Sequence, residues 1–73
     1  MFVEWLLQQK ERKDSVGLLS HTVSKDPTFP RSSDKLWLFL HYFRHEPGAR
    51  SAIKIAHKEW RRLNSMQRIG MTR

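Results

Sequence analysis

Residues 49–63, ARSAIKIAHKEWRRL, place apolar and basic side chains at intervals typical of an α-helix. On a helix that turns about 100° per residue, five apolar side chains fall within roughly 60° of one direction. A stripe this narrow is typical of a helix that packs one face against a core. The pattern therefore predicts a core-facing helix whose apolar stripe is Ala52, Ile53, Ala56, Trp60 and Leu63.

The other side of the same predicted helix is basic. Its members fall between about 80° and 220° on the same projection and are Arg50, Lys54, His57, Lys58, Arg61 and Arg62. Arg68 extends this row if the helix continues, although we expect the helix to end near Asn64. Arg50 is the weakest member, because a cation near a helix start opposes the helix dipole. Folding does not require these charges, so they indicate either an anionic partner or a solvated face that keeps a small protein soluble.

Two shorter helices are predicted in the first third of the chain. Residues 2–9 hold apolar side chains too closely spaced for the alternation of a strand. A second helix follows a cap at Asp14 or Ser15, whose side-chain oxygen can accept a free N–H of the first turn. This helix would bury one face, which consists of Val16, Leu19 and Val23.

A further helix is predicted after the prolines at 27 and 30, which disfavour a helix across residues 25–31. Ser32 or Ser33 is expected to cap it, and Pro47-Gly48 to end it. Its core stripe would be Leu36, Phe39, Leu40 and Phe43. Three apolar side chains lie outside that stripe: Trp37, Leu38 and Tyr42. They predict either a central helix packed on several sides or an exposed patch for a protein partner or self-association.

These elements predict an all-α fold, a compact four-helix bundle with short loops over residues 1–64, followed by a loose basic tail at residues 65–73. A chain of 73 residues forms one small domain, which buries only about 60% of its unfolded surface. It holds no cysteine and therefore no disulfide or thiolate metal site. The apolar start is too short for a membrane span and lacks a signal-peptide pattern, so we expect a cytoplasmic protein.

The centre of the chain carries a recognisable motif. Residues 26–34 read D-x-x-F-P-[K/R]-x-S-D, with Asp26, Phe29, Pro30, Arg31, Ser33 and Asp34 at the defined positions. Lys13-Asp14-Ser15 opens a helix upstream, Phe2-x-x-Trp5-Leu6 stands near the start, and Glu59-Trp60 lies in the last helix. Together these residues resemble the YozE family of small bacterial proteins, and the resemblance covers residues 2 to about 63.

That resemblance implies a compact four-helix bundle with a sterile-alpha-motif-like (SAM-like) fold, and it implies no particular biochemical activity. The motif residues are expected to be structural: Phe29 as a plug in the core, and Asp14 and Ser33 as helix caps. The basic face of the last helix is not part of the resemblance. It is a feature of this sequence.

The charge of the chain is uneven and favours a binding function. Residues 1–36 hold six Lys or Arg and five Asp or Glu, whereas residues 37–73 hold eight and two. Such asymmetry suggests nucleic acid, an anionic membrane or an acidic protein surface. We expect weakly sequence-specific nucleic-acid binding, to DNA rather than RNA, and keep a protein-interaction module as the alternative. A membrane surface is disfavoured because the apolar stripe is narrow and needed for the core.

Catalytic chemistry finds little support in the sequence. The carboxylates are scattered, no nucleophile motif is present, and three glycines form no phosphate-binding loop. His41 and His45 have the i, i+4 spacing of helical metal ligands, but no third ligand accompanies them. We therefore expect a protein that is not an enzyme, with no cofactor, no metal and no small-molecule substrate.

Overall fold

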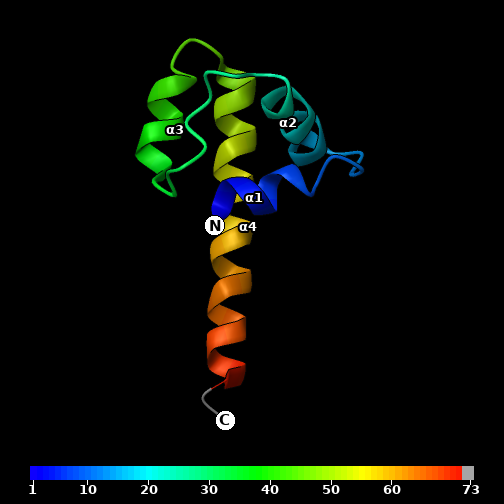
Figure 1. The fold of residues 1–73 in the computed structure, drawn as a ribbon, viewed down its shortest axis with the longest axis vertical. Coiled ribbons are helices and arrows are strands. Elements are labelled where there is room, and N and C mark those ends of the chain that lie inside the picture. Colours follow the sequence, from blue (N-terminus) through cyan, green and yellow to red (C-terminus); the bar gives the residue numbers. More distant parts are fainter. Residues whose placement is uncertain (72–73) are drawn as a thin grey trace.

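The computed structural model describes the backbone of residues 1–71 and the side chains of residues 1–65. Within this range the regular elements are four α-helices, as the sequence predicts: α1 (Phe2–Leu7), α2 (Ser15–Ser24), α3 (Leu36–Tyr42) and α4 (Pro47–Met71). Helix α4 contacts each of the other three, and α1 also contacts α2. Figure 1 shows α2 and α3 flanking the N-terminal half of α4, with α1 crossing it and the C-terminal half projecting beyond the bundle.

The core forms where the four helices meet. Phe2 of α1 is fully buried, and its ring centroid lies 5.2 Å from that of Phe39 and 5.6 Å from that of Trp60. The apolar stripes predicted for α2 and α3 face this core. Phe29, predicted as a plug, is 3% exposed and stacks on Phe39 with centroids 5.3 Å apart. The buried apolar residues are Phe2, Val3, Leu6, Val16, Leu19, Val23, Phe29, Phe39, Phe43, Ala52, Ile53 and Ala56.

The start of α2 confirms the predicted cap. Asp14 Oδ1 accepts the backbone N–H of Gly17 at 3.0 Å, which satisfies a donor that the first helical turn leaves free. Position 17 requires glycine, because an added Cβ would lie 1.9 Å from the carbonyl oxygen of Arg12. Arg12 also pairs with Asp14 at 2.7 Å and with Glu59 of α4 at 2.7 Å. Its guanidinium holds the pKa of the Asp14 carboxyl below its usual range and ties the start of α2 to α4.

The boundaries of α3 differ from those predicted. Lys35 occupies the N-cap position without a side-chain capping bond, and Ser33 Oγ instead accepts the N–H of Lys35 at 3.0 Å in the preceding turn. The prediction of a cap at Ser32 or Ser33 is therefore wrong. Pro47-Gly48 does not end α3 either, since these residues begin α4. Proline suits this place because the backbone N–H of a first helical residue has no acceptor within the helix, so proline loses no hydrogen bond there.

Helix α4 is longer than predicted. It begins at Pro47 and continues to Met71, so the predicted end near Asn64 is wrong, and residues 65–71 are helical rather than a loose tail. Residues 72 and 73 lie outside the described part of the chain. Twenty-five helical residues span about 37 Å, which accounts for a longest dimension of 43 Å. Leu63, predicted in the buried stripe, is 41% exposed.

The segment 26–34, which carries the sequence motif, is held by its own polar side chains. Asp26 accepts the hydroxyl of Tyr42 at 2.5 Å and the N–H of Thr28 at 3.0 Å. These bonds lower the pKa of the Asp26 carboxyl, and the bond to Asp26 raises the pKa of Tyr42. Arg31 donates to the carbonyl oxygens of Val23 at 2.9 Å and Asp26 at 3.3 Å, near the end of α2.

The end of this segment fastens the first residues of the chain. Asp34 Oδ1 accepts the backbone N–H of Phe2 at 2.9 Å, and the carbonyl oxygen of Asp34 accepts from Nε2 of His57 at 2.8 Å. A carbonyl can only accept, so Nε2 is the protonated ring nitrogen in this bond. The segment thus joins α1, α2, α3 and α4, and this explains why its polar residues are structural.

Among the described residues, no helix is both long enough and apolar enough to cross a membrane.

Candidate functional site

Four of the predicted cations line one groove. It lies where the start of α3 meets α4 and has a volume of about 400 Å³. Leu36 contributes from α3, and α4 contributes the rest of the lining: Lys54, His57, Lys58, Arg61, Arg62 and Ser65. We call this hollow the basic groove. The sequence placed these cations only on one face of a helix, and the structure shows that they line a common hollow with Leu36 of α3.

The apolar stripe of α4 determines where the basic groove faces. Ala52, Ile53 and Ala56 are at most 4% exposed, because they pack against the other helices. Burying that stripe turns the side of α4 that lies about 100–180° away toward solvent. Lys54 and Lys58, one helical turn apart, are exposed there, as are Arg61 and Arg62. The fold therefore presents these four cations along one wall.

The cations of the basic groove have no acidic partner among the described side chains. In residues 1–65 the ion pairs within 4 Å join the N-terminal amine to Glu4, and Arg12 to Asp14 and Glu59. Glu59 lies on α4 between Lys58 and Trp60, but it is taken by Arg12. Four cations that are unpaired and close together repel one another. An anionic ligand would relieve that repulsion.

Arg50 does not belong to this groove. It is half-buried, and its Nη1 donates to the carbonyl oxygen of Leu40 at 2.6 Å. Its guanidinium therefore satisfies the end of α3 and lies outside the groove lining, and its role as a binding residue stays a prediction. The side chain of Arg68 lies outside the described residues.

His57 is also not a free member of the basic face. Its side chain is 6% exposed, and its ring packs 5.0 Å from Phe2 and 5.5 Å from Trp60, centroid to centroid. It forms the inner wall of the groove rather than its charged rim. The sequence carries a signal for the burial of His57. On the helical projection it lies at about 80°, closer to the apolar stripe than any other residue of the basic face.

The three apolar residues of α3 outside its stripe do not form one patch. Tyr42 packs edge-on against Phe29 with centroids 5.4 Å apart, and its hydroxyl bonds to Asp26 and Thr28. Leu38 is half-buried, whereas Trp37 is 67% exposed. The predicted patch is therefore wrong as a unit, and Trp37 is its one strongly exposed side chain.

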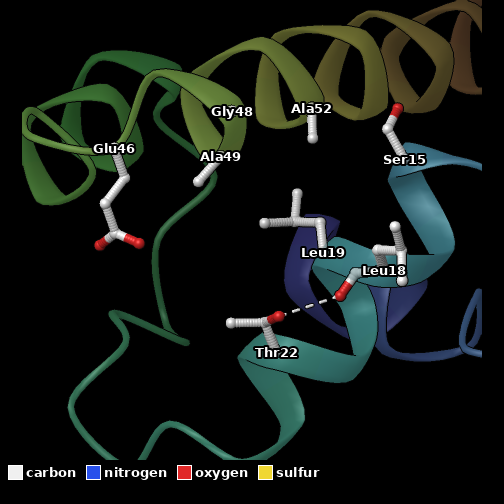
Figure 2. Close-up of a pocket in the computed structure, with 8 residues that line it drawn as sticks. All are labelled: Ser15, Leu18, Leu19, Thr22, Glu46, Gly48, Ala49 and Ala52. Atoms are coloured by element: carbon white, nitrogen blue, oxygen red, sulfur yellow. Dashed lines mark hydrogen bonds between the residues drawn. The ribbon is translucent and has the colours of Figure 1, made fainter.

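A second hollow lies on the other side of α4 and has a different character. It measures about 290 Å³, and its lining side chains are mostly uncharged. Figure 2 shows α2 supplying Ser15, Leu18, Leu19 and Thr22 and the start of α4 supplying Gly48, Ala49 and Ala52, with Glu46 at one end. Thr22 Oγ1 donates to the carbonyl of Leu18 at 3.1 Å. Its lining holds one charge, the carboxylate of Glu46, so it is not suited to an anion.

Histidine metal binding receives no geometric support. Helix α3 ends at Tyr42, so His45 lies past its end and the two histidines do not share a helical face. Among the residues that the structure describes, no three histidine or acidic side chains gather closely enough to hold a metal ion.

Comparison with known families agrees with this architecture. A family model described as the YozE SAM-like fold matches residues 1–64. The chain therefore belongs to this family, and the four helices are those of its fold. No curated protein and no solved structure matched the chain. The family assignment accounts for the bundle and leaves the basic groove without an assigned role.

Proposed function

We propose that this member of the YozE SAM-like family is a nucleic-acid-binding module, with DNA as its ligand, that holds the phosphate backbone in the basic groove. The observation that supports the proposal is the gathering of Lys54, Lys58, Arg61 and Arg62 in one hollow, without acidic partners among the side chains of residues 1–65. By contrast, Arg12, Arg31 and Arg50 each donate hydrogen bonds within the fold. On this proposal the protein binds and does not catalyse.

The spacing of the cations suits a phosphate backbone. Arg62 lies eight positions after Lys54, which is about 12 Å along a helix. Successive phosphates of one strand of a duplex are about 3.4 Å apart along the axis, so this row can neutralise roughly three of them. Neutralised phosphates release condensed counterions, and the affinity would fall with a slope of log K against log salt of about −3.

Sequence readout by this site would be weak. Lysine and arginine contacts to phosphate fix position and carry no sequence information. Ser65 is the uncharged polar side chain in the groove lining, and Asn64 is exposed next to it on α4. Arginine can read guanine in the major groove, but a site dominated by phosphate contacts binds many sequences with similar affinity.

A charge-reversal experiment tests the proposal. Lys58→Glu with Arg61→Glu is compared with the matched control Lys10→Glu with Lys13→Glu, which makes the same change in net charge at exposed sites outside the groove. Fluorescence anisotropy with random duplex and single-stranded DNA is recorded across a salt series. The wild type and the control should bind at low salt with a steep salt dependence, and the groove variant should not.

Two results would overturn the proposal. Equal loss in both variants would mean that net charge, and not the groove, attracts the ligand. Absence of binding by the wild type to either DNA form at low salt would leave an acidic protein surface as the partner of the groove, which is the alternative that the charge pattern allows.

A further inference from the structure

Trp37 is the tryptophan that does not pack against the core. It is 67% exposed, whereas Trp5 and Trp60 are partly buried against the core. Among the described residues its ring makes no aromatic pair, although Phe29, Phe39, Tyr42 and Phe43 all do. Tryptophan gains much from burial when it has a partner surface. An exposed one on a small domain is therefore a candidate contact residue.

Trp37 does not line the basic groove, but its position on α3 places it on the flank of that helix nearer to the groove. It directly follows Leu36, which lines the groove. Around the axis of α3, Trp37 lies about 60° from Leu40. The carbonyl oxygen of Leu40 accepts a hydrogen bond from Arg50 of α4. Tyr42 lies about 140° from Trp37 and bonds to Asp26 in the segment on the opposite side of α3. The flank of α3 that carries Trp37 is thus the one beside α4.

A row of cations beside an exposed aromatic ring is suited to single-stranded rather than double-stranded nucleic acid. Cations hold the phosphates of either form of DNA. A flat ring can stack only on a base that is not already stacked between its neighbours, as bases are in a duplex. Proteins that bind single strands combine a positive groove with aromatic side chains of this kind.

We infer that the preferred ligand of the basic groove is single-stranded nucleic acid, with the phosphates on Lys54, Lys58, Arg61 and Arg62 and one unpaired base stacked on Trp37. This inference rests on the proposed function and narrows its ligand. Leu36, the apolar residue between Trp37 and the cations, would contact the sugar or the edge of the base. The discrimination between single strand and duplex then comes from Trp37, and the salt dependence comes from α4.

The test compares Trp37→Ala, Trp37→Phe and a control variant. Leu18→Ala is a suitable control, because Leu18 is a large apolar side chain that is 72% exposed on α2, away from the groove. Binding is measured by anisotropy at low salt for a labelled oligothymidylate and for the same strand annealed to its complement. Circular dichroism checks that each variant is folded.

Trp37→Ala should weaken binding to the single strand about tenfold, the loss expected for one base–aromatic stack. It should leave binding to the duplex unchanged. Trp37→Phe should retain most of the affinity, and Leu18→Ala should behave as the wild type.

Two outcomes overturn the inference, and they are distinguishable. If Trp37→Ala weakens neither form, or both forms equally, while the wild type still binds DNA, then Trp37 does not stack on a base and the proposed function stands without it. If the wild type binds neither oligonucleotide, the proposed function fails and the inference fails with it.

Discussion

Arg31 and Lys54 are both exposed cations, but their surroundings differ. Arg31, in the segment 26–34, donates to two backbone carbonyl oxygens near the end of α2. Lys54, in the basic groove, has no acidic partner among the described side chains and lies beside three other cations. A charge with internal partners stabilises the fold, whereas a cluster of charges without them costs energy unless a ligand binds. On the proposed function, the two regions therefore separate charges that stabilise the fold from charges that are available to a ligand.

The largest effect expected from this contrast is on the segment 26–34. Phe29→Ala should lower the free energy of unfolding by about 3–5 kcal/mol, the usual cost of deleting a buried phenyl ring. The ring is 3% exposed and stacks on Phe39, so its loss leaves a cavity between α3 and the segment. A domain this small has little stability to spare, so we expect the variant to be largely unfolded.

Urea unfolding followed by circular dichroism measures this difference. Trp37→Ala is the matched control, since it also removes an aromatic ring, from an exposed position. It should unfold at nearly the same urea concentration as the wild type. A loss below about 1 kcal/mol for Phe29→Ala would show that the segment is not part of the core.

A pair of single neutralisations sharpens the comparison. Arg31→Gln should lower the free energy of unfolding by about 1 kcal/mol, because its bonds to the carbonyls are partly exposed, and should leave the salt slope of DNA binding unchanged. Lys54→Gln should reduce that slope by about one, as expected for one lost phosphate contact, with little change in stability. Urea unfolding and anisotropy on both variants measure the four values.

Because each variant removes one positive charge, each serves as the control for the other. Equal effects of the two changes on DNA affinity would contradict the separation between the regions. A marked loss of stability in Lys54→Gln would contradict it as well, since it would give the groove a part in folding.

The sequence predicted the elements better than their ends. The apolar stripes at Val16, Leu19 and Val23, and at Ala52, Ile53 and Ala56, bury as expected because burial follows helical periodicity directly. The cap at Asp14 followed from local chemistry. The start of α3 could not be found in this way, because Ser33 bonds within the preceding turn and the neighbouring Asp34 is used to hold the first residue of α1.

The site was predicted in part for a similar reason. A helical projection places cations on one face, and it found Lys54, Lys58, Arg61 and Arg62 correctly as exposed neighbours. It cannot show which of them another element reaches. Arg50 donates a hydrogen bond to the end of α3, and His57 donates one to the segment 26–34. Both contacts depend on tertiary structure. Leu36 entered the groove for the same reason, since only packing brings α3 against α4.

The smallest effect expected is a pH dependence confined to the fold. The bond from Tyr42 holds the pKa of the Asp26 carboxyl below its ordinary value of 3.8, so the unfolded chain binds this proton more readily than the folded one. The resulting stability is complete well above that value and is lost as the pH falls through it toward the lower pKa of the folded state. Asp14, beside Arg12, acts in the same direction.

Asp26→Asn should therefore flatten, without abolishing, the decline in stability between about pH 5 and pH 2. Urea midpoints measured across this range test the prediction. Glu11→Gln is the control, because Glu11 is an exposed carboxylate with no hydrogen-bond partner among the described residues, and it should follow the wild type. A pH dependence that Asp26→Asn leaves intact would assign the acid sensitivity to carboxylates other than Asp26.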